Sequence, residues 1–353
     1  MKIKLAILDK DANYLNRIVS MFNNKYADRL VVYSFTDSET ALNSLETEKI
    51  DVFIASEEFK IDTSRLPKKC GFVYFVEASS VESLYDQRTI CKYQKADLIY
   101  KEILGIYAEV ASATTGFKLD SNSSVSIITF LSAGGGVGSS TMAAACSLSL
   151  TRKGKKVLYL NLEQNGLSSS FFHGEGQLDL NDVIYTIKSK RSNLALKLES
   201  AVKQDDTGVS FYESPKVALD MVGLSEEDIR RLLTELKLTA SYDYIIVDTD
   251  FIYDKKCYEI MNASNLIIFV SDGSEIANSK LNRTMEALNI IEQGNNLNVL
   301  SRTVLLYNKF SSKTAKTDNI DLKVLGGAPR FEGATTRQLM EQLASMSFFD
   351  TLI

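Results

Sequence analysis

The sequence predicts an α/β protein with two doubly wound domains, each built on a parallel sheet that helices cover on both faces. Three observations lead to this prediction. Apolar segments alternate with helix-period segments over residues 1–110, a glycine-rich loop joins a strand to a helix at 132–141, and a Ser/Thr-rich stretch lies between them. Strands buried on both faces read as continuous apolar runs. We therefore expect domains at 1–112 and 125–353, joined by a linker at 113–124.

The first half contains five apolar segments typical of buried strands, at 3–8, 30–33, 51–55, 72–76 and 89–93. Between the first two, apolar residues recur at helical spacing at Tyr14, Leu15, Ile18, Val19 and Phe22. The stretch 36–39, Thr-Asp-Ser-Glu, fits a capping box and marks the start of a second helix. A final apolar helix pattern covers 98–107. This alternation is typical of a parallel sheet with helices on both faces.

Composition excludes several classes of protein. The 40 basic and 45 acidic residues give a net charge of −5, spread evenly along the chain. Neither half is basic, so we expect no nucleic-acid partner. No apolar run approaches the roughly 18 residues of a membrane span, so no integral membrane segment is expected. The four cysteines are scattered without metal-ligand spacing, which favours reduced, structural thiols in a cytoplasmic protein.

The stretch Ser132–Thr141 reads Ser-Ala-Gly-Gly-Gly-Val-Gly-Ser-Ser-Thr, follows an apolar strand and opens an alanine-rich helix. This order is typical of a phosphate-binding loop. Glycines let backbone N–H groups turn inward around phosphate oxygens, and the helix N-terminus adds partial positive charge. The loop contains no lysine, although phosphoryl transfer needs cations to stabilise charge on the γ-phosphate. We therefore expect nucleotide binding with slow or absent hydrolysis.

A second apolar strand, within 242–250, ends in the carboxylate of Asp248. This is the Walker B arrangement, in which the aspartate holds the hydration shell of Mg²⁺. Loop and strand together predict a bound nucleotide and Mg²⁺, with Asp248 at the metal. A glycine run that is only a tight structural turn is the alternative, and the accompanying Walker B strand disfavours it.

These features resemble the MinD/ParA family of deviant Walker A ATPases over most of 125–353. The family's loop, Lys-Gly-Gly-x-Gly-Lys-Thr-Thr, corresponds here to Gly134, Gly135, Gly136, Val137, Gly138, Ser139, Ser140 and Thr141. The resemblance implies that Gly134 replaces the signature lysine, which reaches the partner subunit's phosphates, and that Ser139 replaces the P-loop lysine. It also implies that Ser140 keeps a hydroxyl for Mg²⁺ and Thr141 one for the α-phosphate.

The same resemblance implies three further site residues. Glu163 matches the residue that orients the attacking water, Asn308 the asparagine that contacts adenine, and Pro329 the end of a Gly-x-x-Pro segment near the base. Replacement cations for the missing lysines are sought directly after these motifs, at Lys255, Lys256 and Arg330. We expect these three to be ordinary surface charges.

The first half resembles the receiver domain of two-component response regulators. Asp9 and Asp11 correspond to the receiver's acidic metal pair and Lys95 to its lysine, whereas Ser56 stands at the phosphoacceptor aspartate. Because a serine cannot form an acyl phosphate, the resemblance implies a domain without phosphorelay chemistry. Such a domain offers a surface for dimerisation or partner docking.

A receiver-like domain ahead of such an ATPase resembles the TadZ/CpaE family of Flp/tad pilus-assembly and localisation proteins. The resemblance implies an ATP-binding scaffold that is a homodimer and binds pilus or secretion machinery proteins. It implies a cytoplasmic location, at the cell pole or the inner face of the membrane through partners.

Two alternatives remain. One is an active MinD/ParA-type ATPase that cycles dimerisation, and the other is a DNA-partition or regulatory protein. The charge balance disfavours the second. MinD-like proteins also end in a basic amphipathic membrane helix, but segment 337–353 has a single arginine. We expect this segment to pack against the ATPase core.

Overall fold

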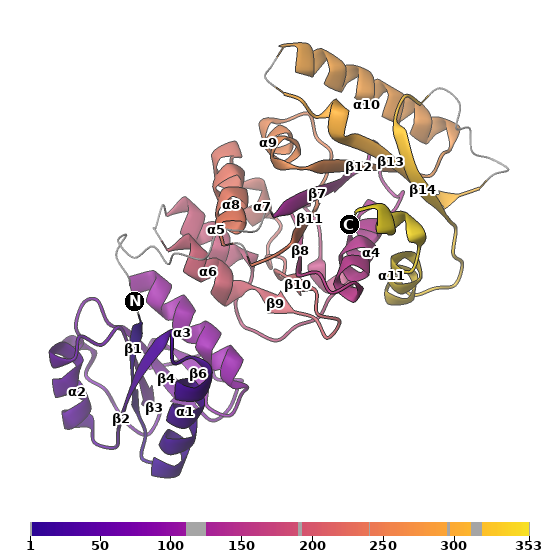
Figure 1. Ribbon diagram of the computed structural model, residues 1–353. Helices are drawn as coiled ribbons and strands as arrows, with labels where there is room; N and C mark the ends of the chain where they lie inside the picture. Colours follow the sequence, from indigo (N-terminus) through magenta and orange to yellow (C-terminus); the bar gives the residue numbers. More distant parts are fainter. Residues whose placement is uncertain are drawn as a thin grey trace. The chain divides into compact units, whose positions relative to one another are not determined.

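The computed structural model describes residues 2–110, 125–189, 193–239, 241–294, 297–311 and 320–352. They form two compact units, drawn in Figure 1. The first combines the described parts of 1–118 with those of 189–201, and the second combines those of 119–188 and 202–353. The predicted linker at 113–124 lies outside the described residues.

The sheet of the first unit has the order β2-β1-β3-β4-β6-β5. Its strands are β1 (Ile3–Leu8), β2 (Leu30–Phe35), β3 (Val52–Ser56), β4 (Gly71–Val76), β5 (Ser83–Leu84) and β6 (Gln87–Cys91). All pairs are parallel except β5 with β6. The two-residue β5 is the one strand of this sheet that the sequence pattern did not predict.

Helices cover both faces of this sheet because successive strand residues point to opposite sides. Helices α1 (Ala12–Lys25) and α3 (Ala96–Val110) pack against Leu5 and Ile7. Helix α2 (Ser38–Thr47) packs on the other face, against Ala6 and Leu8 (Figure 1). A short 3₁₀ turn, η1 (Thr63–Arg65), lies between β3 and β4.

Helix α6 (Leu194–Ala201) packs on α3 and belongs to the first unit, although it lies inside the range predicted for the second domain. Leu196 is buried in the same apolar cluster as the α3 residues. Lys197 is 3.3 Å from the Glu109 carboxylate, and Asn193 donates to the Ala108 carbonyl at 3.3 Å. The buried lysine therefore has an acidic partner, as a charge removed from water requires.

The second sheet has the order β14-β13-β12-β7-β11-β8-β10-β9. Its strands are β7 (Ser126–Leu131), β8 (Val157–Asn161), β9 (Lys203–Gln204), β10 (Ser210–Phe211), β11 (Tyr244–Asp248), β12 (Leu266–Ser271), β13 (Thr303–Phe310) and β14 (Lys323–Pro329). All pairs are parallel except β9 with β10. Two parallel-dominated sheets with helices confirm the predicted α/β class.

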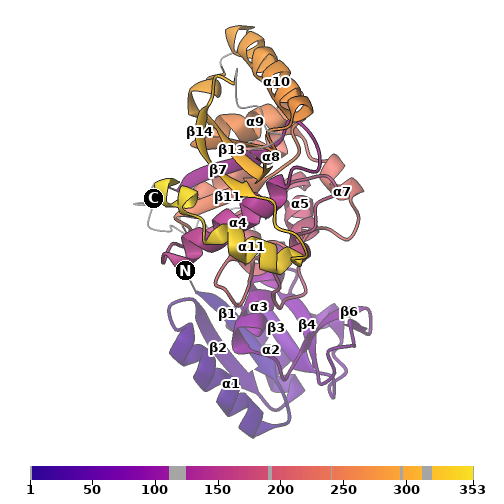
Figure 2. The ribbon, with the colours of Figure 1, turned by 90° about the vertical axis from the view of Figure 1, so that its right-hand side faces the viewer.

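Helices α4 (Ser139–Arg152) and α11 (Thr336–Ala344) lie on one face of the second sheet, and α9 (Lys255–Ala263) and α10 (Glu275–Gly294) on the other (Figures 1 and 2). The faces alternate along β12, where Ile268 packs toward α4 and Ile267 toward α9 and α10. The remaining helices and 3₁₀ turns are η2 (Ser168–Ser170), α5 (Leu180–Lys188), α7 (Leu219–Val222), α8 (Glu226–Leu238), η3 (Leu300–Arg302) and η4 (Ser347–Leu352).

The C-terminal segment packs against this core, as predicted. Helix α11 lies on α4, and Phe348 and Phe349 of η4 are buried in the cluster that α4 forms with the sheet. Among the described helices, none has the length and hydropathy that crossing a membrane would need.

Candidate nucleotide and magnesium site

The glycine loop lies where β7 ends and α4 begins, at the carboxyl edge of the parallel sheet. Gly136 and Gly138 have φ values of +80° and +87°, in the left-handed region that favours glycine. A Cβ added to Gly135 or Gly136 would meet no atom within 4 Å, so this side of the loop is open. Backbone N–H groups of an open loop at a helix N-terminus are suited to an anion.

Gly138 is held closely from the neighbouring strand β13. A Cβ on Gly138 would lie 2.5 Å from Nδ2 of Asn308, which donates to the carbonyl of Val137 at 2.8 Å. Asn308, predicted to contact adenine, is buried and holds the loop in place. Pro329 at the end of β14 is paired in register with Phe310 of β13. Their contacts to a base stay predictions.

We expect Gly138→Ala to weaken nucleotide binding at least about tenfold. The left-handed backbone costs an alanine about 1–2 kcal/mol, and the new Cβ displaces Asn308. Gly154→Ala is the matched control, because Gly154 has a φ of +77° and open space around its Cβ position. Calorimetric titration with ATP and Mg²⁺ checks the difference. Equal affinity in the two variants would show that the loop's shape does not matter for binding.

Three of the predicted site residues come together beside the loop. Asp248, at the carboxyl end of β11, is fully buried, and its Oδ1 atom has no hydrogen-bond partner in the protein. Ser140, in the first turn of α4, donates to Oε1 of Glu163 at 3.1 Å. Burial, and then the charge of Glu163, raise the pKa of Asp248 well above its usual range. Burial also raises the pKa of Glu163, and the nearby Asp250 adds to this effect.

These residues fit a magnesium ion. A buried carboxylate oxygen without a partner, beside a serine hydroxyl and a second carboxylate, is a donor set suited to a cation. Mg²⁺ is usually bound through one or two carboxylates together with waters and substrate phosphates. Over the described ranges, no group of three or more His, Cys, Asp or Glu side chains could hold a metal. The site therefore suits an ion that phosphates and water help to bind, and does not suit an all-protein metal cage.

Two polar residues of β8 organise this cluster. The Tyr159 hydroxyl donates to Oδ2 of Asp248 at 2.7 Å, and Oδ1 of Asn161 accepts from the backbone N–H of Glu163 at 3.0 Å. Burial, and then the Asp248 charge, raise the pKa of Tyr159 well above its usual range. The hydroxyl therefore keeps its proton and acts as a hydrogen-bond donor to Asp248. Sequence analysis missed Tyr159. The available signal was a tyrosine between two leucines of an apolar strand, because a buried hydroxyl needs a partner.

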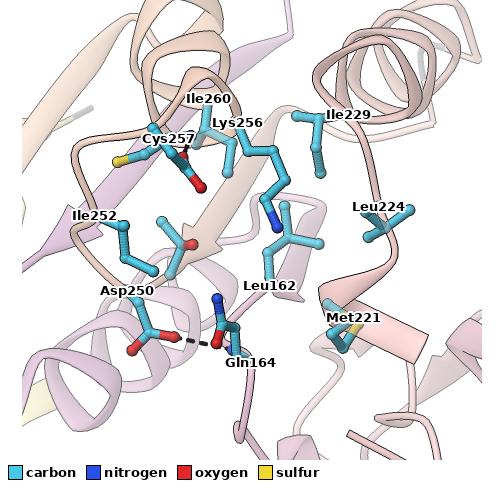
Figure 3. A pocket seen from close by; sticks show the side chains of 12 residues that line it. Leu162, Gln164, Met221, Leu224, Ile229, Asp250, Ile252, Lys256, Cys257 and Ile260 are labelled. Carbon is cyan, nitrogen blue, oxygen red and sulfur yellow. Dashed lines mark hydrogen bonds between the residues drawn. The ribbon is translucent and has the colours of Figure 1, made fainter. Parts of the chain in front are cut away.

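A separate cavity lies between the ends of β8 and β11 and helices α8 and α9 (Figure 3). Its volume of about 30 Å³ accommodates about two water molecules and no nucleotide. The side chain of Lys256 extends into it, and the backbone N–H of Gln164 donates to Oδ2 of Asp250 at 2.9 Å on its rim.

In the first unit, the acidic residue Asp9 pairs with a different lysine from the one that the sequence analysis predicted. Nζ of Lys92 is 2.7 Å from Oδ2 of Asp9, and both side chains are buried. The prediction of Lys95 was wrong, because β6 ends at Cys91 and the exposed Lys95 precedes α3. Asp11 caps helix α1 through the backbone N–H groups of the residues that follow it.

The fold of the second unit is similar to that of P-loop proteins of the ParA/MinD type. A ParA family ATPase from Chlorobium tepidum TLS has the same fold in the second unit, with a TM-score of 0.52 and 19% identity over 65% of this chain and 96% of that chain. Two further similar structures are the MinC:MinD cell division complex of Aquifex aeolicus (TM-score 0.47, 16% identity, 64% and 93% covered) and MinD with Mg-ADP from Pyrococcus horikoshii OT3 (0.47, 18%, 62% and 94%).

Sequence comparison identifies the two parts of the chain. Residues 1–108 match the model of the TadZ-like receiver domain, and residues 125–300 match the model of an AAA domain. No curated protein matches the chain. The chain therefore has a TadZ-like receiver domain followed by an AAA domain whose fold is similar to that of ParA-type ATPases, which confirms the predicted resemblance.

Proposed function

We propose that this protein is an ATP- and Mg²⁺-binding scaffold of the TadZ/CpaE type, with slow or absent hydrolysis. The observation that carries the proposal is the buried, unpartnered carboxylate oxygen of Asp248, which lies beside Ser140 and an open glycine loop. A relic of a nucleotide site has no reason to keep a buried carboxyl group with one unpaired oxygen, since an unsatisfied buried polar atom destabilises the folded state.

In this proposal the loop from Gly134 to Thr141 binds the phosphates through its N–H groups. Ser140 and Asp248 hold Mg²⁺, and Asn308 and Pro329 lie at the base. Magnesium, when bound, neutralises part of the phosphate charge. The loss of one charge-assisted hydrogen bond costs about 1.5–3 kcal/mol, so the missing P-loop lysine weakens ATP binding and does not abolish it.

Hydrolysis depends more strongly on cations than binding does. Glu163 is placed by Ser140 and Asn161 and would orient the attacking water. However, the loss of a finger-like cation from a phosphoryl-transfer site costs about 10³–10⁵ in rate. The bound nucleotide would then act as a structural ligand that favours a homodimer.

The receiver-like domain supports the docking part of the proposal. Ser56 is buried at the end of β3 and cannot form an acyl phosphate. Lys92 forms an ion pair with Asp9. Without phosphorelay chemistry, the domain serves to dock partner proteins of a Flp/tad-type pilus system. Such docking would hold the protein at the cell pole or the inner face of the membrane from the cytoplasmic side.

A phosphate-release assay, run beside light scattering with and without ATP and Mg²⁺, tests this function. We expect dimers that form with ATP and Mg²⁺, and release at least about 10³-fold slower than from an active ParA-type ATPase assayed in parallel. Comparable turnover that is lost in Asp248→Ala would instead favour an ATPase that cycles dimerisation. Retardation of a DNA duplex at low salt would favour a DNA-partition protein.

A further inference from the structure

Lys280, on α10, lies beside the glycine loop although no sequence motif indicates it. A Cβ built on Gly134 would lie 3.3 Å from Cδ of Lys280 and 3.6 Å from its Nζ. The ammonium group therefore occupies the space into which a side chain at position 134 would project. The topology explains this proximity: β12 pairs with β7, so α10, which follows β12, begins at the sheet edge where the loop lies.

Lys309, near the end of β13, reaches the same loop from the next strand. Its Nζ donates to the carbonyl of Gly136 at 2.7 Å, and its Cε would lie 3.9 Å from a Cβ on Gly138. The backbone φ of Lys309 is +56°, a left-handed conformation that costs a non-glycine residue about 1–2 kcal/mol. Strained positions of this kind concentrate at functional sites.

We propose that Lys280 and Lys309 supply the positive charge for a nucleoside di- or triphosphate that the lysine-free loop cannot supply. The inference rests on the proposed function and names two residues of its phosphate site. Both side chains are exposed and so can reach a ligand. An ammonium group has three donors, so Lys309 can hold the Gly136 carbonyl and a phosphate oxygen together. Each lysine would stand in for a family lysine from a different position in the chain.

Two features separate this arrangement from surface charge elsewhere. The ammonium groups approach the loop from neighbouring elements at the edge where Ser140 and Asp248 lie. They also approach the two ends of the segment 134–138, whose N–H groups are directed at phosphates in such loops. Lysine contacts to phosphate act through charge, so their contribution grows with the number of phosphates.

Titrations with ATP, ADP and AMP in Mg²⁺ test the proposal with the full chain. We expect Lys280→Ala and Lys309→Ala each to weaken ATP binding about tenfold, to weaken ADP binding less, and to leave AMP binding unchanged. Lys323→Ala is the control, because this exposed lysine lies at the first residue of β14, the opposite end of the strand from Pro329. Unchanged AMP binding also reports that the variants are folded.

A rescue experiment sharpens the test. Gly134→Lys alone should not improve ATP binding, because the new side chain meets Lys280. In the Lys280→Ala background the same change should restore it, since an ammonium returns to the same space. The inference is overturned if the wild type binds ATP and the Lys280→Ala/Lys309→Ala double variant binds it equally well. It is also overturned if the substitutions weaken AMP binding as much as they weaken ATP binding. If the wild type binds no ATP, the proposed function itself fails.

Discussion

Replacing Lys92 with alanine is expected to destabilise the first unit by about 3–5 kcal/mol, the cost of removing one partner of a buried ion pair. Lys92 is 7% exposed and Asp9 is 1% exposed, and the alanine variant leaves the Asp9 carboxylate buried without its cation. The ammonium also lies 4.5 Å from the centre of the Tyr14 ring, and that cation–π contact is lost as well.

Hydrogen exchange followed by mass spectrometry measures this change within the intact chain. Peptides from β1 and α1 should lose protection, whereas peptides from the second unit serve as an internal reference. The double variant Asp9→Asn/Lys92→Met removes both charges and should recover most of the stability. A single variant within about 0.5 kcal/mol of the wild type would show that the pair does not stabilise the domain.

The ion pair also sets a pH dependence. Burial lowers the pKa of Lys92, but Asp9, with smaller contributions from Tyr93 and Asp11, outweighs this effect and raises the pKa above 10.5. The pair's contribution to stability is therefore complete below pH 10.5 and is lost as the pH rises through the higher folded-state value. The Lys92→Ala variant should lack this alkaline loss of protection.

Asp248→Asn is expected to have opposite effects on stability and on binding. Without Mg²⁺ the variant should be more stable by about 1–3 kcal/mol, because it removes a buried carboxyl group that has an unpartnered oxygen and whose ionisation burial and Glu163 oppose. The amide oxygen can still accept from Tyr159. With Mg²⁺ the same variant should lose the metal dependence of ATP binding, because an amide is a poorer ligand for this ion.

Thermal unfolding with a chelator and ATP titration with and without Mg²⁺ measure these two effects. Asp206→Asn is the matched control, because this carboxylate is exposed and lies outside the metal site. It should change stability by less than about 0.5 kcal/mol. An Asp248→Asn protein that is less stable in the chelator would contradict the account of the metal site.

Sequence reasoning predicted the fold class and selected residues that come together in the candidate site, because those signals are local. Strand, loop and helix are contiguous at 126–152, and a carboxylate at a strand end is visible at Asp248. Other features depend on tertiary structure. The strand predicted at 89–93 ends at Cys91 in the structure, two residues earlier, and the lysine that pairs with Asp9 is Lys92 and not the predicted Lys95. The packing of α6 with the first unit has no local signal, since an apolar helix face does not indicate which core it joins.

Lys280 shows the same limit, whereas Lys309 directly follows the matched Asn308 and was overlooked. Sequence reasoning looked for replacement cations directly after the matched motifs, and Lys256, one of those candidates, extends into a separate cavity. Lys280 reaches the loop only because β12 pairs with β7, a pairing that the sequence alone does not specify. Residues distant in the chain supply charge to a site when strand order brings their elements to one edge.

Calorimetric titration of the wild-type protein with ATP, with and without Mg²⁺, tests most directly whether the lysine-free loop is a working nucleotide site. We predict a dissociation constant of about micromolar order with Mg²⁺. Binding should be much weaker in its absence, because the proposed site binds the phosphates together with an ion held by Asp248 and Ser140. Absence of binding at millimolar ATP with Mg²⁺ would contradict the account and would leave protein docking as the function of both domains.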